Sequence, residues 1–277
     1  MFLARLFAVG LVVALSPSAA SAQDLPPALA ARFAEGVTAL KAGDLEDAEQ
    51  VFRDLLRKGG DRGFVHHNLG LVLQQRGRHS DALIEFRTAS RLDPSFGPAR
   101  LLAGVSLLAL DRAAEAVVVL ERAVKLMPNE PAAHLQLGEA YERTGRIEGV
   151  VDEYRRLVDL SPRNDEYAYR LGKLYLRLAQ LSYERLRMAN PKSARSSQAL
   201  ATEYARQGRR DLAAQEFERA AQLDPTLVEI HLALAQLYAA EQRWDDAARE
   251  VDRELALVPE SRDAMELKTK IMERRAP

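Results

Sequence analysis

The chain has 277 residues and a formal net charge of −1, from 39 basic and 40 acidic side chains. This balance gives neither the basic surface of a nucleic-acid-binding protein nor the polybasic patch of a membrane-surface binder. The absence of cysteine excludes disulfides and thiolate metal sites. Apolar residues make up 47% of the chain, which is enough to build a sizeable core.

Residues 1–22 have the pattern of a secretory signal peptide. Arg5 precedes an apolar run over 6–15, and Ala20-Ser21-Ala22 fits a small-x-small cleavage site. The alternative is a retained membrane anchor, although a span needs roughly 20 apolar residues. We therefore expect an exported protein, periplasmic or secreted, with no membrane span after cleavage. Its mature chain would start with a short segment over 23–28.

From residue 29 onward, three markers recur with a common period of 34 residues, the separation of Gly36 and Gly70. The first is glycine, at Gly36, Gly70, Gly104, Gly138 and Gly172. The second is a small residue, at Ala48, Ala82, Ala116, Ala213 and Ala247. The third is proline, at Pro94, Pro128 and Pro162 and again at Pro191, Pro225 and Pro259. Three markers with one period indicate an array of repeats.

Each period predicts two antiparallel helices of about 13 residues. The glycine and the alanine let the two helices approach closely, and the proline ends the second helix. A glycine between the helices permits a left-handed turn. One such pair cannot bury its apolar face alone, so successive pairs are expected to stack into a solenoid.

The phased motif resembles the tetratricopeptide repeat (TPR) family. Repeat four carries it as Leu137-Gly138, Tyr141, Gly145, Tyr154 and Pro162. The resemblance implies an all-α fold, a right-handed α-solenoid of antiparallel helix pairs with about seven TPR units. We assign repeats one to seven to residues 29–62, 63–96, 97–130, 131–164, 165–193, 194–227 and 228–261. A capping helix is expected over 262–277.

Repeat five is shortened, because five residues of its turn are missing. Leu171-Gly172 and Tyr175 begin a first helix, while Ala179, Tyr183 and Pro191 fit a second one. Between Asp165 and Asn190 only Gly172 discourages a helix, and apolar residues keep helical spacing from Leu171 to Ala189. We therefore expect the two helices to fuse into one, dividing repeats one to four (29–164) from repeats six and seven (194–261). A tightened turn in an uninterrupted solenoid is the alternative.

No catalytic or cofactor-binding motif is present, so we expect a non-enzymatic protein without cofactor or metal. His66, His134 and His231 occupy the fourth position of repeats two, four and seven. The TPR resemblance places a buried side chain there, and a metal site would need the three histidines to converge although they lie in separate repeats. We therefore interpret all three as packing residues.

In the TPR family, the first helix of each repeat lines a concave groove. The inward positions of repeats one to three are largely apolar, and we take them as candidate partner-binding residues: Phe33, Val37, Leu40, Phe64, His67, Leu71, Leu101, Val105 and Leu108. An exposed apolar strip of this kind marks a protein contact. The alternative is that these side chains pack between the repeats. Repeats four to six contribute polar residues of mixed charge.

The sequence therefore predicts a scaffold or adaptor that binds a protein or peptide partner in the periplasm or cell envelope. One alternative is a structural subunit of an export or polysaccharide-secretion assembly. Another is an enzyme or ligand-binding protein, which would need a deep pocket with convergent polar groups. No nucleic-acid partner is expected, and the sequence leaves a homo-oligomer open. It does not name the partner.

Overall fold

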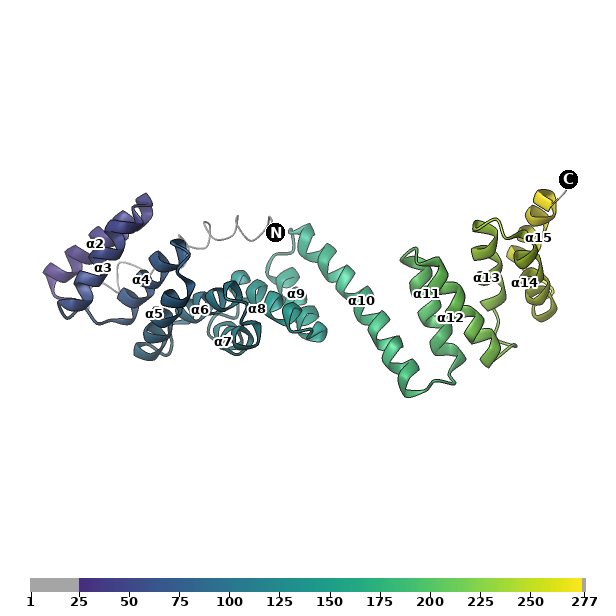
Figure 1. Ribbon diagram of the computed structural model, residues 1–277, viewed down its shortest axis with the longest axis horizontal. Helices are drawn as coiled ribbons and strands as arrows, with labels where there is room; N and C mark the ends of the chain where they lie inside the picture. The colour runs from purple at the N-terminus through teal and green to yellow at the C-terminus, as the bar shows by residue number, and fades with distance from the viewer. Residues whose placement is uncertain (1–24, 276–277) are drawn as a thin grey trace. The chain divides into compact units, whose positions relative to one another are not determined.

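A computed structural model describes residues 25–275, and the predicted signal segment lies outside this range. Within these residues, every regular element is an α-helix, so the predicted all-α fold is confirmed. The helices are α2 (Pro27–Ala42), α3 (Leu45–Arg57), α4 (Gly63–Gln75), α5 (His79–Leu92), α6 (Gly97–Ala109), α7 (Ala113–Leu126), α8 (Pro131–Arg143), α9 (Ile147–Leu160), α10 (Asp165–Ala189), α11 (Ala194–Arg206), α12 (Arg210–Leu223), α13 (Ile230–Ala240), α14 (Trp244–Leu257) and α15 (Arg262–Arg275) (Figure 1).

The chain divides into two compact units, which are described separately. Unit 1 runs to Leu174, and unit 2 begins at Tyr175. In unit 1 the helix pairs are α2/α3, α4/α5, α6/α7 and α8/α9. In unit 2 they are α11/α12 and α13/α14, followed by α15, which packs on α14 and buries Ala264 and Ile271. Within each unit, the second helix of one pair also contacts the first helix of the next, so the pairs stack.

The two helices of a pair approach closely where the first helix carries the periodic glycine. In repeat two, a Cβ atom on Gly70 would lie 2.6 Å from the ring of Phe86 on α5. In repeat three, a Cβ atom on Gly104 would overlap the side chain of Leu120 on α7. Phe86 and Leu120 are fully buried. The glycines therefore provide the space that the largest second-helix side chains fill.

The turn between the two helices of a pair requires a left-handed residue. Gly77 and Gly145 have φ values of 75° and 72° at this point. Repeat three has Asp111 there instead, and Asp111 adopts the same conformation with a φ of 57°. The aspartate therefore keeps the same left-handed backbone conformation, but this conformation costs more free energy for aspartate than for glycine.

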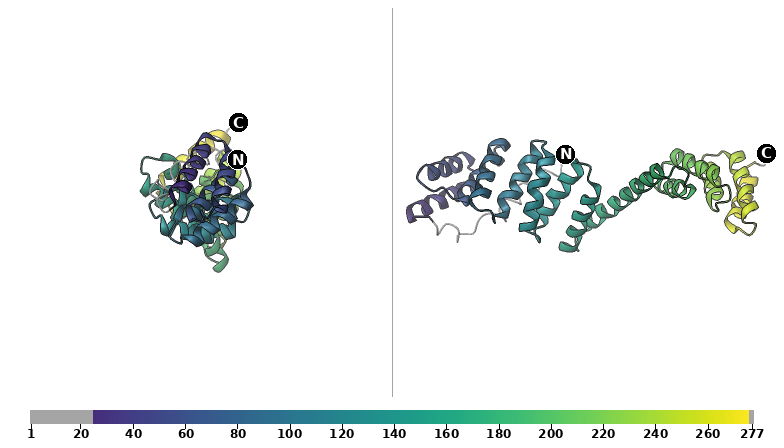
Figure 2. Two further views of the ribbon diagram at one scale, coloured as in Figure 1. Left: turned by 90° about the vertical axis from the view of Figure 1, so that its left-hand side faces the viewer. Right: turned by 90° about the horizontal axis from the view of Figure 1, so that it is seen from below.

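Repeat five contains no turn. α10 is one continuous helix of 25 residues, about twice the length of the other first helices (Figure 2, right). Its first part packs on α9, where the ring of Tyr167 meets that of Tyr154 with centroids 6.4 Å apart. Its last part packs on α11, where the Tyr204 hydroxyl donates a hydrogen bond to Glu184. No residue of α10 is fully buried.

Candidate partner-binding surfaces

The nine predicted groove residues do not form an exposed apolar strip. Six of them are buried, namely Phe33, Leu40, His67, Leu71, Leu101 and Leu108. The other three, Val37, Phe64 and Val105, are half-buried. The expectation of an open strip is thus wrong for most of these positions, while their role in binding stays a prediction.

The reason for this burial is that successive first helices of unit 1 pack against one another. α2 contacts α4, and α4 contacts α6. The rings of Phe33 on α2 and Phe64 on α4 meet edge to face, with centroids 5.0 Å apart. The His67 ring packs against Phe96 in the same way, at 4.9 Å. Aromatic pairs in this geometry fill the space between repeats that the sequence assigned to a partner.

The first-helix surface that stays accessible in unit 1 combines a few half-buried apolar side chains with polar ones. Val37, Phe64 and Val105 supply apolar area from three successive repeats. Further along, the Arg143 guanidinium pairs with Glu139 at 2.6 Å and donates a hydrogen bond to the Leu108 carbonyl at 2.7 Å. This polar pair therefore connects repeats three and four at the surface. We call these five residues, Val37, Phe64, Val105, Glu139 and Arg143, the first-helix surface.

The three histidines at the fourth repeat position each pair with a glutamate of the second helix. Nδ1 donates to the carboxylate at 2.6 Å in His66–Glu85, at 2.6 Å in His134–Glu153 and at 2.7 Å in His231–Glu250. The sequence-based interpretation of these histidines as packing residues therefore did not include their glutamate partners. The pairing had a visible pattern in the sequence, because the glutamate follows the histidine by 19 residues in all three pairs.

Two of these histidines have acceptors at both ring nitrogens. His66 Nε2 faces Asp61 at 2.9 Å, and His134 Nε2 faces the Pro128 carbonyl at 3.0 Å. Only the protonated ring can donate at both nitrogens. Burial lowers the pKa of each ring, but the hydrogen bonds to the carboxylates and to the Pro128 carbonyl outweigh it and raise both pKa values above the ordinary range. These rings therefore fasten the first helix to the second.

A second recurring pair joins neighbouring repeats. Tyr141 donates from its hydroxyl to Glu121 at 3.0 Å, Tyr204 to Glu184 at 3.1 Å, and Tyr238 to Glu218 at 2.5 Å. The glutamate precedes the tyrosine by 20 residues in every case. Burial and the nearby Glu121 carboxylate raise the pKa of Tyr141 to about 12, so this hydroxyl remains a donor. Glu184 on α10 is therefore equivalent to Glu121 and Glu218, which lie on the second helices of their repeats.

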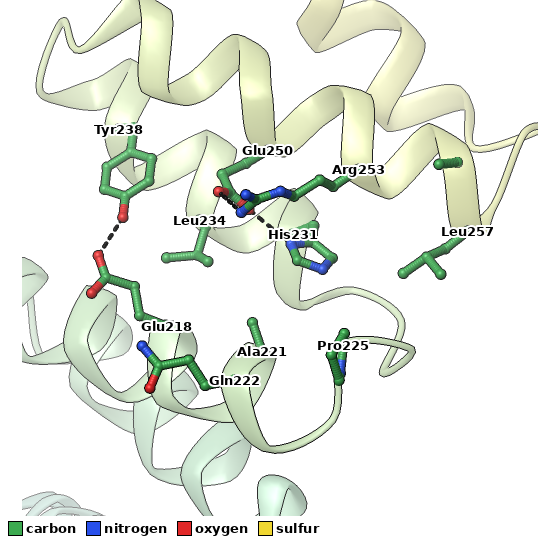
Figure 3. Close-up of a pocket in the computed structure, with 11 residues that line it drawn as sticks. Glu218, Ala221, Gln222, Pro225, His231, Leu234, Tyr238, Glu250, Arg253 and Leu257 are labelled. Carbon is green, nitrogen blue, oxygen red and sulfur yellow. Dashed lines mark hydrogen bonds and ion pairs between the residues drawn. The ribbon is translucent and has the colours of Figure 1, made fainter.

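Unit 2 has a cavity of about 660 Å³ between α12, α13 and α14 (Figure 3). Two ion-paired or hydrogen-bonded sets lie on its wall: Tyr238 with Glu218, and His231 with Glu250, whose second oxygen accepts from Arg253 at 2.6 Å. Leu234 and Leu257 provide apolar lining. The polar groups are directed at one another across the wall, so the cavity is a shallow interhelical recess with its charges already paired.

In the described part of the chain, no three His, Asp or Glu side chains converge as a metal site would need. Among the same residues, no helix is both long enough and apolar enough to cross a membrane. The fold and its surfaces define a helical-repeat protein built from stacked antiparallel pairs.

Two family models, both described as tetratricopeptide repeat, match this chain. One matches residues 18–62 and 67–131, and the other matches residues 107–174 and 204–271. Together they cover most of the sequence, and the chain belongs to the tetratricopeptide repeat family. The predicted fold class and family are thereby confirmed.

Several solved structures align with this chain at low sequence identity. A tetratricopeptide repeat protein from Parabacteroides merdae aligns with 89% of this chain and 100% of its own, at 14% identity and a TM-score of 0.50. The Naa15/Naa10 complex bound to HypK aligns with 88% of this chain but 39% of the matched chain, at 16% identity and a TM-score of 0.51. MamA aligns with 71% of this chain and 92% of its own, at 18% identity and a TM-score of 0.46. A search of curated proteins gave no match.

Proposed function

We propose that this protein is a non-enzymatic TPR scaffold that binds a partner protein through the first-helix surface of unit 1. The observation that carries the proposal is its membership of the TPR family, whose repeats present successive first helices side by side. The half-buried Val37, Phe64 and Val105 offer apolar contacts, and Glu139 and Arg143 offer polar ones at the same kind of position. A partner helix or extended peptide with an apolar stripe and a charged end fits this surface.

The proposed location is outside the cytoplasm, in the periplasm or cell envelope or secreted. The support comes from residues 1–22, which combine a basic start, a short apolar run and a small-x-small site. N-terminal sequencing of the protein from its native source tests this proposal directly. A start at Gln23 supports it, and a start at Met1 in the soluble cytoplasmic fraction contradicts it.

The binding proposal is tested by crosslinked capture from the envelope fraction with the mature chain as bait. The test variant is Val37→Glu/Val105→Glu, which places two charges on the first-helix surface without replacing a fully buried side chain. The matched control is Ile84→Glu/Val118→Glu, because Ile84 and Val118 are exposed on second helices of the same unit. Circular dichroism checks that all three proteins are equally helical.

We expect one partner to be captured by the wild type and by the control, and to be lost with the test variant. A partner that stays bound to Val37→Glu/Val105→Glu removes the first-helix surface from the proposal. A partner lost with the control but kept with the test variant places the contact on the second helices. Failure to capture any protein with any bait argues against the scaffold function itself.

A further inference from the structure

Three positions are always enclosed between the two helices of a complete repeat. They are position 8, which holds a small residue, position 20, which holds alanine or valine, and position 27. In repeats one, two and four these residues are Gly36, Ala48 and Leu55; Gly70, Ala82 and Ala89; and Gly138, Val150 and Leu157, all buried. Repeats three, six and seven bury the same positions.

Repeat five keeps the residue types but not the burial. Gly172 is exposed, and a Cβ atom placed on it would have no atom beyond its own stretch of helix within 4 Å. Leu186, the counterpart of Leu55 and Leu157, is 50% exposed. Ala179, the counterpart of Ala82, is only half-buried. The faces that meet in a complete repeat are therefore both open in repeat five.

The missing helix–helix contact follows from the continuous helix. In repeats two and three, a second-helix side chain fills the space beside the glycine, as Phe86 does for Gly70. The counterpart of Phe86 in repeat five is Tyr183, and the missing turn brings it nearer in sequence to Gly172. In one helix these two residues lie about 16 Å apart along the axis, so Tyr183 cannot reach the Gly172 of its own chain.

The open positions form one strip of small, apolar and tyrosine side chains along α10. From Tyr169 onward a spacing of three or four residues places them on the same face of the helix, and Ala168 lies at its edge: Ala168, Tyr169, Gly172, Leu176, Ala179, Tyr183 and Leu186. Tyr169 is 62% exposed and Leu176 is 48% exposed. Two charged residues border this face: the Lys173 ammonium lies over the Tyr169 ring at 5.4 Å, and Arg187 pairs with Glu216 of α12. Arg170, Arg177 and Arg185 lie around the opposite side, because each is turned by more than about 130° from Gly172. We call this set of seven residues the α10 strip.

We propose that the α10 strip pairs with the α10 strip of a second copy of this chain, in antiparallel orientation. Gly172 of each copy then receives Tyr183 of the other, as Gly70 receives Phe86. In the same register, Tyr169 lies opposite Leu186 and Leu176 lies opposite Ala179. A two-fold axis between residues 177 and 178 relates the copies, and the contact forms twice. The inference concerns a different surface from the one proposed for partner binding.

The sequence favours a second copy of this chain as the binding partner of the α10 strip. Each copy carries Tyr183 and Leu186, the second-helix residues that would pack against the open first-helix positions of the other copy. The last part of α10 already occupies a second-helix place, shown by the Tyr204–Glu184 hydrogen bond and by the packing of Tyr183 on the core of unit 2. Its first part already occupies a first-helix place on α9. Pairing the two copies therefore supplies each half of α10 with the helix that it lacks, and it completes two repeats.

The first test is the molar mass by light scattering of wild type, Gly172→Leu and Arg177→Leu. In a single chain a Cβ atom at 172 would meet no atom beyond its own stretch of helix within 4 Å, so an exposed leucine there should leave the fold intact. In the dimer it would collide with Tyr183 of the second copy. We expect wild type and the Arg177→Leu control to have the mass of two chains, and Gly172→Leu that of one, with equal helicity. A monomeric wild type at the highest attainable concentration, or a dimeric Gly172→Leu, overturns the proposal.

The second test fixes the orientation of the pairing, and it uses the absence of native cysteine. Chains with Tyr169→Cys and chains with Leu186→Cys are mixed and treated with a short bismaleimide. We expect crosslinks in the mixture and none for Leu186→Cys alone, because the two copies of residue 186 would lie about 25 Å apart along the axis. Crosslinking of Leu186→Cys to itself, or to a different protein of the envelope fraction in place of a second copy, overturns the proposal.

Discussion

Repeats two and five begin alike and end differently. Both start their first helix with Leu-Gly, at Leu69-Gly70 and Leu171-Gly172, and both carry an aromatic residue at the same second-helix position, Phe86 and Tyr183. In repeat two the glycine lies against Phe86 of the second helix, whereas in repeat five no atom beyond its own stretch of helix lies within 4 Å of a Cβ placed on Gly172. The residues that form the helix–helix contact are thus present in both repeats, and the turn decides whether they meet within one chain.

The largest expected effect is a change of oligomeric state when a turn is inserted into repeat five. Inserting Thr-Gly-Arg-Ile-Glu, a copy of residues 144–148, between Arg177 and Leu178 returns the repeat to the length of its complete neighbours. The glycine can then adopt the left-handed conformation that Gly145 has. We expect the inserted chain to fold as a closed repeat and to be monomeric by light scattering.

The control for the insertion is a stretch of equal length without glycine, Glu-Ala-Ala-Ala-Lys, which continues the helix. With Tyr169→Cys and Leu186→Cys in the same chain, the turn insertion should give an intramolecular crosslink and the alanine-rich insertion should not. A turn-inserted chain that still forms dimers would show that repeat five does not close, and that the turn is not the deciding element.

The next largest expected effect is a difference in stability between variants that lack the ring of Phe86 and variants that lack the ring of Tyr183. Phe86→Ala removes a fully buried ring and should lower the free energy of unfolding by about 3–5 kcal/mol. Tyr183→Ala removes a half-buried ring and should cost about 1–2 kcal/mol in dilute, monomeric protein. Urea denaturation followed by circular dichroism measures both changes. Equal losses would mean that Tyr183 is as enclosed in the single chain as Phe86.

The glycines predict changes of opposite sign. Gly70→Ala places a methyl group 2.6 Å from the Phe86 ring and should lower the free energy of unfolding by about 1–3 kcal/mol. Gly172→Ala places it in open space within a helix and should raise that free energy by about 0.5–1 kcal/mol in dilute protein. The melting temperatures of the two variants should therefore move in opposite directions. A loss for Gly172→Ala at low concentration contradicts an open repeat five.

The repeat pattern was predictable from the sequence because its markers have steric roles. Glycine, alanine and proline at fixed spacing determine where helices approach and end, so the helix pairs follow from residue types alone. The five missing turn residues favoured a continuous α10, but the same residue types also fitted a tightened turn. The two acceptors of His66 and His134 were not anticipated, because a helical period indicates which side of a helix is buried but not which polar groups meet there.

The burial of the predicted groove was harder to infer. Phe33 and Phe64 have the same inward placement in their repeats, and sequence positions alone do not show whether they face a groove or each other. The distance of 5.0 Å between their rings depends on how closely α2 and α4 stack. That stacking is set by side-chain volumes in three dimensions, so six of the nine residues lie in the core and three remain accessible.

The smallest predicted effect is a dependence of stability on pH that repeat two has and repeat five lacks. Repeat five has Ala168 and Ser182 at the positions of His66 and Glu85. Because the folded state raises the pKa of His66, it binds the proton more tightly than the unfolded chain, whose histidine pKa is about 6.5. The resulting stabilisation is fully present below pH 6.5 and is lost as the pH rises through the higher pKa of the folded state.

Glu85→Gln removes the carboxylate from this pair and should bring the pKa of His66 down, as measured from the imidazole proton shifts by NMR. The difference in unfolding free energy between wild type and Glu85→Gln should then be larger at pH 6 than at pH 8. His79 is the internal control, because burial alone lowers its pKa and no carboxylate is paired with it. Its titration midpoint should not move with Glu85→Gln. A difference that grows towards pH 8 would mean that the neutral ring, and not the imidazolium, holds α4 against α5.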